Sequence, residues 1–120
     1  MKIIGLIWLG TRTPQYAETT RFAEEVLGLE QEFGEEGMTG FRLADGSLFE
    51  VFGADHPGGG HPVDGVAGGF RVDDLKGAIA ELKAAGVEVR PLQSSGSIGW
   101  VYFRAPDGNF YELIGTLPKN

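Results

Sequence analysis

A twelve-residue stretch that occurs twice is the feature that most constrains what this chain can fold into. Residues 42–53 read RLADGSLFEVFG and residues 104–115 read RAPDGNFYELIG, and five of the twelve aligned positions are identical. Internal repeats of this kind indicate copies of one supersecondary unit, because each copy buries its apolar face against a neighbour. The repeat therefore predicts a chain built of two similar modules.

Both halves place the same elements before the repeated stretch. Each half opens with an extended run, Ile3 to Thr13 in the first and Gly65 to Val72 in the second. Each run leads into a helical pattern that ends at a glycine, Gly28 or Gly86. Glycine adopts the left-handed conformation in which helices commonly stop, so these two positions predict the ends of the helices.

Residues typical of helix starts precede the two helical patterns. Thr13 can cap the first helix with Pro14 at its first position, and Asp73 can cap the second with Asp74 near the positive helix end. Apolar residues spaced three and four apart predict the side of each helix that faces a sheet. These are Phe22, Val26 and Leu29 in the first helix, and Leu75, Ile79 and Leu82 in the second.

Three short strand-like runs follow each helix. They are residues 29–33, 38–43 and 47–52 in the first half, and 87–91, 100–104 and 109–114 in the second. The last two runs of each half join at an Asp-Gly pair, which favours a tight hairpin turn. The order of elements predicts an α+β fold of two βαβββ modules in a single domain, residues 1–120. Module one is residues 1–53, the linker is 54–64 and module two is 65–120.

Composition disfavours several classes of function. The chain has no cysteine, so disulfides, thiolate metal sites and cysteine nucleophiles are excluded. Ten Lys and Arg against seventeen Asp and Glu give a net charge of −7, which disfavours nucleic acid and anionic membranes as partners. No apolar run approaches the roughly 18 residues that span a bilayer. We therefore expect no nucleic-acid partner and no membrane association, and the lack of cysteine fits a cytoplasmic location.

Three motifs resemble those of one superfamily. Residues 103–113, FRAPDGNFYEL, resemble the F-x-D-P-D-G-N-x-x-E-L hallmark of the vicinal oxygen chelate superfamily, the glyoxalase, bleomycin-resistance and extradiol-dioxygenase group. Residues 21–29 and 70–75 resemble its helix end and its strand-to-helix junction. The resemblance covers nearly the whole chain. It implies a curved, mostly antiparallel eight-stranded sheet around a cleft, the glyoxalase/bleomycin-resistance fold, but it specifies activity poorly because this fold hosts many chemistries.

The resemblance also implies where metal ligands would lie. Metal-using relatives take one ligand, often His, from the first strand of each module and another, usually Glu, from the last strand. The last-strand positions hold Glu50 and Glu112, whereas the first-strand positions correspond to Trp8 and Ala67, which cannot ligate a metal. Two carboxylates can hold Mg²⁺ or Mn²⁺, but Zn²⁺, Ni²⁺ and Fe²⁺ favour imidazole. We therefore expect no cofactor, with Glu50 and Glu112 as the metal ligands if a divalent ion is bound, and neither dioxygenase nor classical glyoxalase activity.

Glu50 and Glu112 interrupt otherwise apolar strands. Strand alternation places Glu50 on the face of Leu48 and Phe52, and Glu112 on the face of Phe110 and Ile114. An ionised carboxylate in an apolar wall needs a compensating partner. Two interpretations stay open: a cleft-lining acid, base or ligand-orienting group, or a carboxylate hydrogen-bonded to its neighbours or to water.

Four other residues are candidate ligand contacts. Trp8 would project a flat ring into the cleft, where it stacks on a planar ligand or fills the cavity as core. Ala67 is small and would leave room opposite that ring. Arg71 can pair with Glu112 or with an acidic ligand, and Trp100 adds aromatic surface at the cleft rim or core.

Histidines and repeated arginines complete the candidate residues. The two histidines, His56 and His61, lie in the linker, and we interpret them as solvated loop residues; the alternative is that one acts as a lid ligand or proton shuttle over the cleft. Arg42 and Arg104 recur with the Asp-Gly turn, which favours a structural salt bridge.

Three functional hypotheses follow. The first is a metal-free small-molecule-binding protein, similar to bleomycin-resistance-type proteins, that holds a planar or partly aromatic ligand. The alternative is a lyase, isomerase or epimerase in which the catalytic Glu50 and Glu112 move protons next to a carbonyl, with or without Mg²⁺ or Mn²⁺. The third is an interaction module with no small-molecule role. Whether the chain is an enzyme stays open, and exposed sheet edges favour a homodimer.

Overall fold

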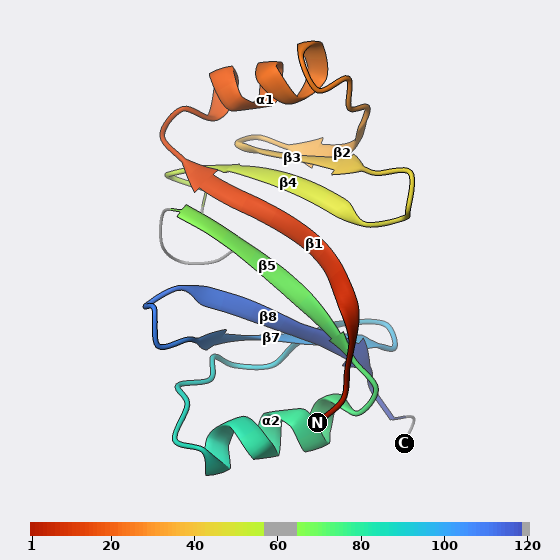
Figure 1. Ribbon diagram of the computed structural model, residues 1–120, viewed down its shortest axis with the longest axis vertical. Coiled ribbons are helices and arrows are strands. Elements are labelled where there is room, and N and C mark those ends of the chain that lie inside the picture. Colours follow the sequence, from red (N-terminus) through yellow and green to blue (C-terminus); the bar gives the residue numbers. More distant parts are fainter. Residues whose placement is uncertain (57–64, 119–120) are drawn as a thin grey trace. The chain divides into compact units, whose positions relative to one another are not determined.

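The computed structural model describes residues 1–56 and 65–118, and these residues form two compact units (Figure 1). One unit is Ile7–Ala67, and the other combines Met1–Leu6 with Gly68–Asn120. The predicted linker residues 57–64, with His61, lie outside the described residues. Both described helices have ten residues, and neither is long and apolar enough to cross a membrane.

Module one forms a four-stranded sheet with one helix. Its elements are β1 (Ile3–Thr13), α1 (Tyr16–Glu25), β2 (Gln31–Glu35), β3 (Met38–Arg42) and β4 (Leu48–Gly53). The strands lie in the order β2-β3-β4-β1, with β1 parallel to β4 and the other pairs antiparallel. Ala23 of α1 packs with Phe41 and Val51, which makes this face of the sheet the core side of module one.

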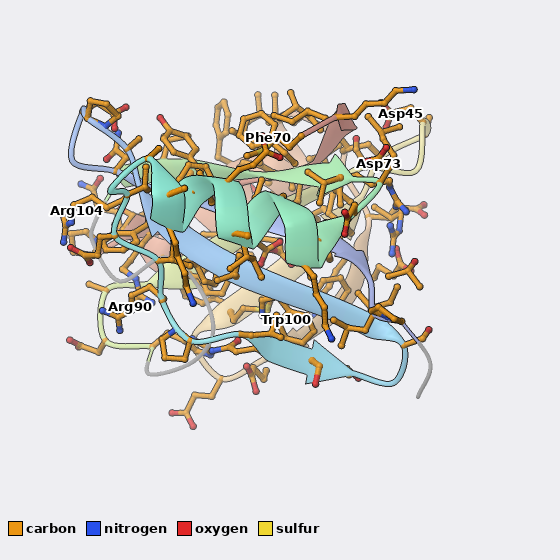
Figure 2. The ribbon with its side chains drawn as sticks, turned by 90° about the horizontal axis from the view of Figure 1, so that it is seen from below. Asp45, Phe70, Asp73, Arg90, Trp100 and Arg104 are labelled. Atoms are coloured by element: carbon orange, nitrogen blue, oxygen red, sulfur yellow. The ribbon has the colours of Figure 1, made fainter. Side chains whose placement is uncertain are left out.

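Module two repeats the arrangement. Its elements are β5 (Gly65–Val72), α2 (Leu75–Ala84), β6 (Gln93–Ser95), β7 (Ile98–Arg104) and β8 (Phe110–Thr116), with the strand order β5-β8-β7-β6. The pair β5 and β8 is parallel, as β1 and β4 are in module one. Figure 2 shows α2 lying across one face of this sheet. Leu75 and Ala78 of the helix pack there with Val101 and Leu113.

The predicted fold class is confirmed. The described residues form eight strands and two helices in the βαβββ order that the repeat predicted, and β1 and β5 have the predicted bounds. Both helices end before glycines in the left-handed region, Gly28 at φ 72° and Gly86 at φ 78°. The stripe predicted for the second helix is also confirmed, since Leu75 is buried and Ile79 and Leu82 pack against the core.

The predicted helix starts are wrong by two residues in the first helix and by one in the second. The first helix begins at Tyr16, after Gln15, and Thr13 is the last residue of β1, where it pairs with Gly53. Pro14 therefore lies before the helix rather than at its first position. The second helix is capped by Asp74, whose side chain accepts a 3.0 Å hydrogen bond from the amide of Gly77, whereas the amide of Asp73 donates to Lys2.

The apolar stripe predicted for the first helix is also wrong. Phe22 is 51% exposed and Val26 67% exposed, whereas Ala23 is buried. Successive helical residues point about 100° apart, so a helix that turns Ala23 to the sheet turns Phe22 away from it. Leu29, beyond the helix, does pack against the core.

The run predicted as a strand at 87–91 is not a strand. Val89 makes one isolated bridge to Phe103, and the edge strand of module two is β6. Arg90 donates its amide to the carbonyl of Tyr102, but the next residue is Pro91, which has no amide hydrogen to continue a ladder. Pairing therefore resumes only at Gln93.

Candidate functional site

Glu50 lies on the face of the module-one sheet opposite α1. Val51 belongs to the core beneath the helix, so its neighbours Glu50 and Phe52 point the other way. The register pairs Glu50 with Gly10 of β1 and with Gly40 of β3. On β1, the residues that share this face are Trp8, Gly10 and Arg12, and Trp8 is only 6% exposed.

Two aromatic rings lie over the glycines beside Glu50. A methyl group added at Gly10 would come within 2.6 Å of the indole of Trp8, and one added at Gly40 would overlap the ring of Phe33. The rings thus occupy the space that side chains at the two neighbouring positions would fill. Glu50 is therefore flanked by an indole and a phenyl ring. Sequence reasoning missed Phe33; the signal was a glycine inside a strand, which marks a close approach.

Arg12 is a buried residue that sequence reasoning also missed. Its Nη1 donates to the carbonyl oxygens of Gly53 at 3.3 Å, Ala54 at 3.2 Å and His56 at 2.8 Å. The guanidinium also lies over the ring of Phe52. These bonds tie the segment that follows β4 to the end of β1. The signal was the repeated Gly-x-Arg spacing at 10–12 and 69–71.

The interpretation of His56 as a solvated loop residue is wrong. Its side chain is 6% exposed, and its Nε2 lies 2.9 Å from Oε1 of Glu35. The imidazole is tilted against Phe52 with ring centroids 5.5 Å apart. The physical reason is Arg12, which holds the backbone of residues 53–56 and so turns the ring inward.

Glu112 occupies the equivalent face of module two. Leu113 and Val101 pack beneath α2, so Glu112 and Tyr102 lie on the opposite face of the sheet. The register pairs Glu112 with Gly69 of β5 and Tyr102 of β7. Glu112 is 6% exposed. In both modules the last-strand glutamate therefore pairs with a first-strand glycine.

The other predicted ligand contacts lie in different surroundings. Ala67 is buried at 2% exposure. Arg71, paired in register with Ile114, is exposed and forms no hydrogen bond or ion pair with any residue in the described ranges. Trp100 is half-buried, and its Nε1 donates a 2.7 Å hydrogen bond to Gln93 on the neighbouring edge strand. Figure 2 shows Trp100 and Arg104 in module two, with Arg104 at the end of β7.

The repeated arginines form salt bridges, as the sequence predicted, and also bond to the Asp-Gly turns. Arg42 forms an ion pair with Glu32 at 2.7 Å and donates to the carbonyl of Gly46. Arg104 forms one with Glu88 at 3.3 Å and donates to the carbonyl of Gly108. Each arginine therefore joins its turn to another segment of its own module.

The aspartates of these turns have shifted pKa values. Hydrogen bonds from the side chain and amide of Ser47 lower the pKa of Asp45 below its ordinary 3.8. The amide of Asn109, followed by the hydroxyl of Tyr111, lowers the pKa of Asp107. The same contact with Asp107 raises the pKa of Tyr111 above 10.0. Both carboxylates thus stabilise the turn in the ionised form.

The side chains beside the two glutamates do not fit a histidine-containing metal site. On β1 the face that bears Glu50 carries an indole, a glycine and a guanidinium; on β5 the matching positions are Ala67, Gly69 and Arg71. None of these side chains offers a lone pair to a metal, and a guanidinium repels a cation. Across residues 1–56 and 65–118, no group of three or more His, Cys, Asp or Glu is arranged to hold a metal ion.

The family of the chain follows from its sequence. A family model described as Glyoxalase/Bleomycin resistance protein/Dioxygenase superfamily matches residues 5–113. The chain therefore belongs to this superfamily, which is the vicinal oxygen chelate group that its motifs resemble. No curated protein matches the sequence.

Solved structures confirm the glyoxalase/bleomycin-resistance fold. A superfamily member from Vibrio splendidus 12B01 is 17% identical, with 95% of this chain and 99% of that chain covered and a TM-score of 0.68. The Mn(II)-bound glyoxalase from Novosphingobium aromaticivorans is 16% identical with a TM-score of 0.76; 99% of this chain is covered but only 42% of that one. Methylmalonyl-CoA epimerase from Mycobacterium tuberculosis is 16% identical, with 97% and 90% covered and a TM-score of 0.64. At these identities the likeness shows the fold alone.

Proposed function

We propose that this protein binds a planar, partly aromatic small molecule without a histidine-containing metal site, and that the ligand contacts the face of module one that bears Trp8 and Glu50. The observation that carries the proposal is the indole of Trp8, which lies over Gly10 directly beside Glu50. An aromatic ring at this position favours stacking on a flat ligand and offers no atom to a metal.

The neighbours of Glu50 support a ligand that has both an apolar and a polar part. Phe33 supplies a second ring on the other side of the carboxyl group, over Gly40. Pockets for small molecules are largely apolar, with a few polar groups that orient the ligand. Glu50 takes the orienting role in this proposal, as an acceptor for a hydroxyl or amine of the ligand. Ala67, Arg71 and Trp100 remain predicted ligand contacts, to be tested by substitution.

The test uses tryptophan fluorescence. The chain has two tryptophans, so Trp100→Phe leaves Trp8 as the single indole. A library of planar aromatic molecules is titrated against this variant, and we expect saturable quenching together with a raised melting temperature. Trp8→Leu in the wild-type background should abolish the stabilisation, whereas Trp100→Phe keeps an aromatic ring at the other predicted contact and should retain most of it.

A parallel screen with divalent metals tests whether the protein binds a metal ion instead of an organic ligand. If Mg²⁺, Mn²⁺, Zn²⁺ or Ni²⁺ raises the melting temperature strongly while no organic ligand does, the metal-free proposal fails. Glu50→Gln then reports whether the stabilising metal uses that carboxylate.

An epimerase or related lyase is the second candidate, favoured by the burial of Glu112 beside Tyr102. A positioned carboxylate with little access to water is suited to move a proton next to a carbonyl. The structural likeness to an epimerase is consistent with this chemistry. Substrates that raise the melting temperature are assayed by NMR for exchange of the α-proton with deuterium. If Glu112→Gln leaves exchange unchanged for every responsive substrate, the catalytic assignment is wrong.

We also propose that the protein is a cytoplasmic homodimer. Apolar side chains along β1 are unusually exposed, with Ile4 at 55%, Leu6 at 69% and Leu9 at 53%. Exposed apolar side chains that lie together favour association with another chain. Analytical ultracentrifugation should show a dimer that Leu6→Lys weakens, and a monomer at all concentrations would contradict the assembly.

A further inference from the structure

We propose a second ligand site, a pocket in the compact unit Ile7–Ala67 that binds a small organic cation. The pocket has a volume of about 630 Å³, and the end of β1, the start of α1, the β2–β3 turn and the segment after β4 all contribute to its lining. Ligand pockets typically span about 300–1,000 Å³, so this volume suits an organic molecule rather than a bare ion. The site is separate from the Trp8 and Glu50 side chains, which are not part of its lining.

A buried histidine shapes the wall of the pocket. The side chain of His56 is 6% exposed, and its Nε2 contacts the carboxylate of Glu35 at 2.9 Å. Arg12 holds the backbone of the same segment through three carbonyl oxygens. The wall is therefore held in place before any ligand arrives, which lowers the entropic cost of binding.

The negative charge of the residues that line the pocket favours a cationic ligand. Three acidic residues line the pocket, Glu35, Glu36 and Asp55, and the lining residues within the described part of the chain include no lysine or arginine. Arg12 is not among these lining residues, and its guanidinium donates to the carbonyls of the 53–56 segment. A cavity lined by one sign of charge concentrates ligands of the opposite sign.

The phenol of Tyr16 indicates that the ligand also has an apolar or aromatic part. Tyr16 is a lining residue, and its hydroxyl is hydrogen-bonded to Thr39, so its orientation is set from outside the pocket. An aromatic ring favours an ammonium group or an apolar skeleton beside it. The chemistry that fits is an ammonium on a hydrocarbon or aromatic frame.

The experiment is an NMR titration of the full ¹⁵N-labelled chain with tyramine as the probe. We expect saturable shifts at the amides of Tyr16, Gly37 and His56. The charge-reversed analogue 4-hydroxyphenylacetate has the same aromatic frame and should leave these amides unchanged. The double variant Glu36→Gln with Asp55→Asn should bind tyramine at least about fivefold more weakly, since each partly exposed charge contact contributes modestly. Both positions are exposed, so the variant should keep a dispersed spectrum.

A matched control removes the same charge elsewhere. Glu24→Gln with Glu25→Gln alters two exposed carboxylates of α1 outside the pocket and should bind tyramine like the wild type. The proposal is overturned if tyramine shifts none of the three amides, if the anionic analogue shifts them equally, or if both double variants weaken binding equally. Trp8→Leu separates the two sites: it should abolish the aromatic ligand of the proposed function and leave the tyramine titration unchanged.

Discussion

The two modules carry the same pattern, yet their first-strand arginines have opposite surroundings. In each module the register places a glycine beside the last-strand glutamate, Gly10 beside Glu50 and Gly69 beside Glu112, with an arginine two residues further on. Arg12 is 8% exposed and bonded to three carbonyl oxygens. Arg71 is exposed.

The segment after the last strand accounts for this difference. In module one β4 ends at Gly53, and the chain turns back so that three carbonyls face the guanidinium. In module two β8 continues to Thr116, and the residue that follows, Leu117, donates its amide to Ser97. The same short pattern thus gives a structural arginine in one module and an accessible arginine in the other.

Replacing the two arginines by methionine tests this contrast and should have the largest effect. Arg12→Met removes a donor shared by three partly buried carbonyl oxygens, so we expect a loss of about 2–4 kcal/mol in the free energy of unfolding. Arg71→Met removes an exposed charge and should change stability by less than about 0.5 kcal/mol. Urea denaturation measures both, and equal losses would break the comparison.

Gly10→Ala examines the packing beside Glu50. The new methyl group would lie 2.6 Å from the indole of Trp8 and 3.0 Å from the carbonyl oxygen of Glu50, so either the ring or the strand must shift. We expect destabilisation of about 1–3 kcal/mol, typical of overpacking. The control in the same strand is Gly5→Ala. No atom lies within 4 Å of a methyl group added there, so the free energy of unfolding should change little. If the two variants lose the same stability, the indole is not held over Gly10.

Tyr111→Phe addresses a difference between the two Asp-Gly turns. Module two has Tyr111 where module one has Phe49, and Asp107 raises the pKa of this tyrosine above 10.0. A pKa raised by folding adds stability that is present below the unfolded value and is lost as pH rises through the folded value. The variant should therefore show a shallower loss of stability above pH 10 than the wild type, measured by denaturation at a series of pH values. An unchanged alkaline slope would contradict the role of this contact.

Stability at acid pH should change least of all, and the two Asp-Gly turns should behave alike there. The pKa values of Asp45 and Asp107 are both lowered from 3.8, so the stability they add is present above that value and is lost as pH falls through the lower folded values. Asp45→Asn and Asp107→Asn should each make stability less dependent on pH below pH 4, in the range where the carboxylates titrate. Hydrogen–deuterium exchange at the two turns measures the change, and an effect at one turn only would show that the repeat is not symmetric there.

Local patterns predicted the modules well. The bounds of β1 and β5, the glycine stops at Gly28 and Gly86 and the arginine-held turns follow from strand alternation, backbone freedom and residue type, all of which act over a few residues. The fold class followed from the repeat for the same reason. The start of the second helix was misplaced because the amide of Asp73 pairs with Lys2, a residue far away in sequence, and Asp74 caps the helix instead.

The candidate site was predicted only in part. Alternation put Glu50 on the face of Phe52 and Glu112 on the face of Phe110, away from the core residues Val51 and Leu113, and the structure agrees. The ring of Phe33 and the burial of His56 were missed. Both depend on which strands become neighbours and on where Arg12 finds its acceptors.

By itself the sequence determined the duplicated βαβββ plan and the family to which the chain belongs. Only the tertiary structure decided that Arg12 is buried while Arg71 is exposed, that two rings flank Glu50, and that His56 contacts Glu35 at the wall of a pocket. The physical reason is that residue type and spacing set the local conformation of a strand or helix. Burial and hydrogen-bond partners depend instead on segments that meet only when the chain has folded.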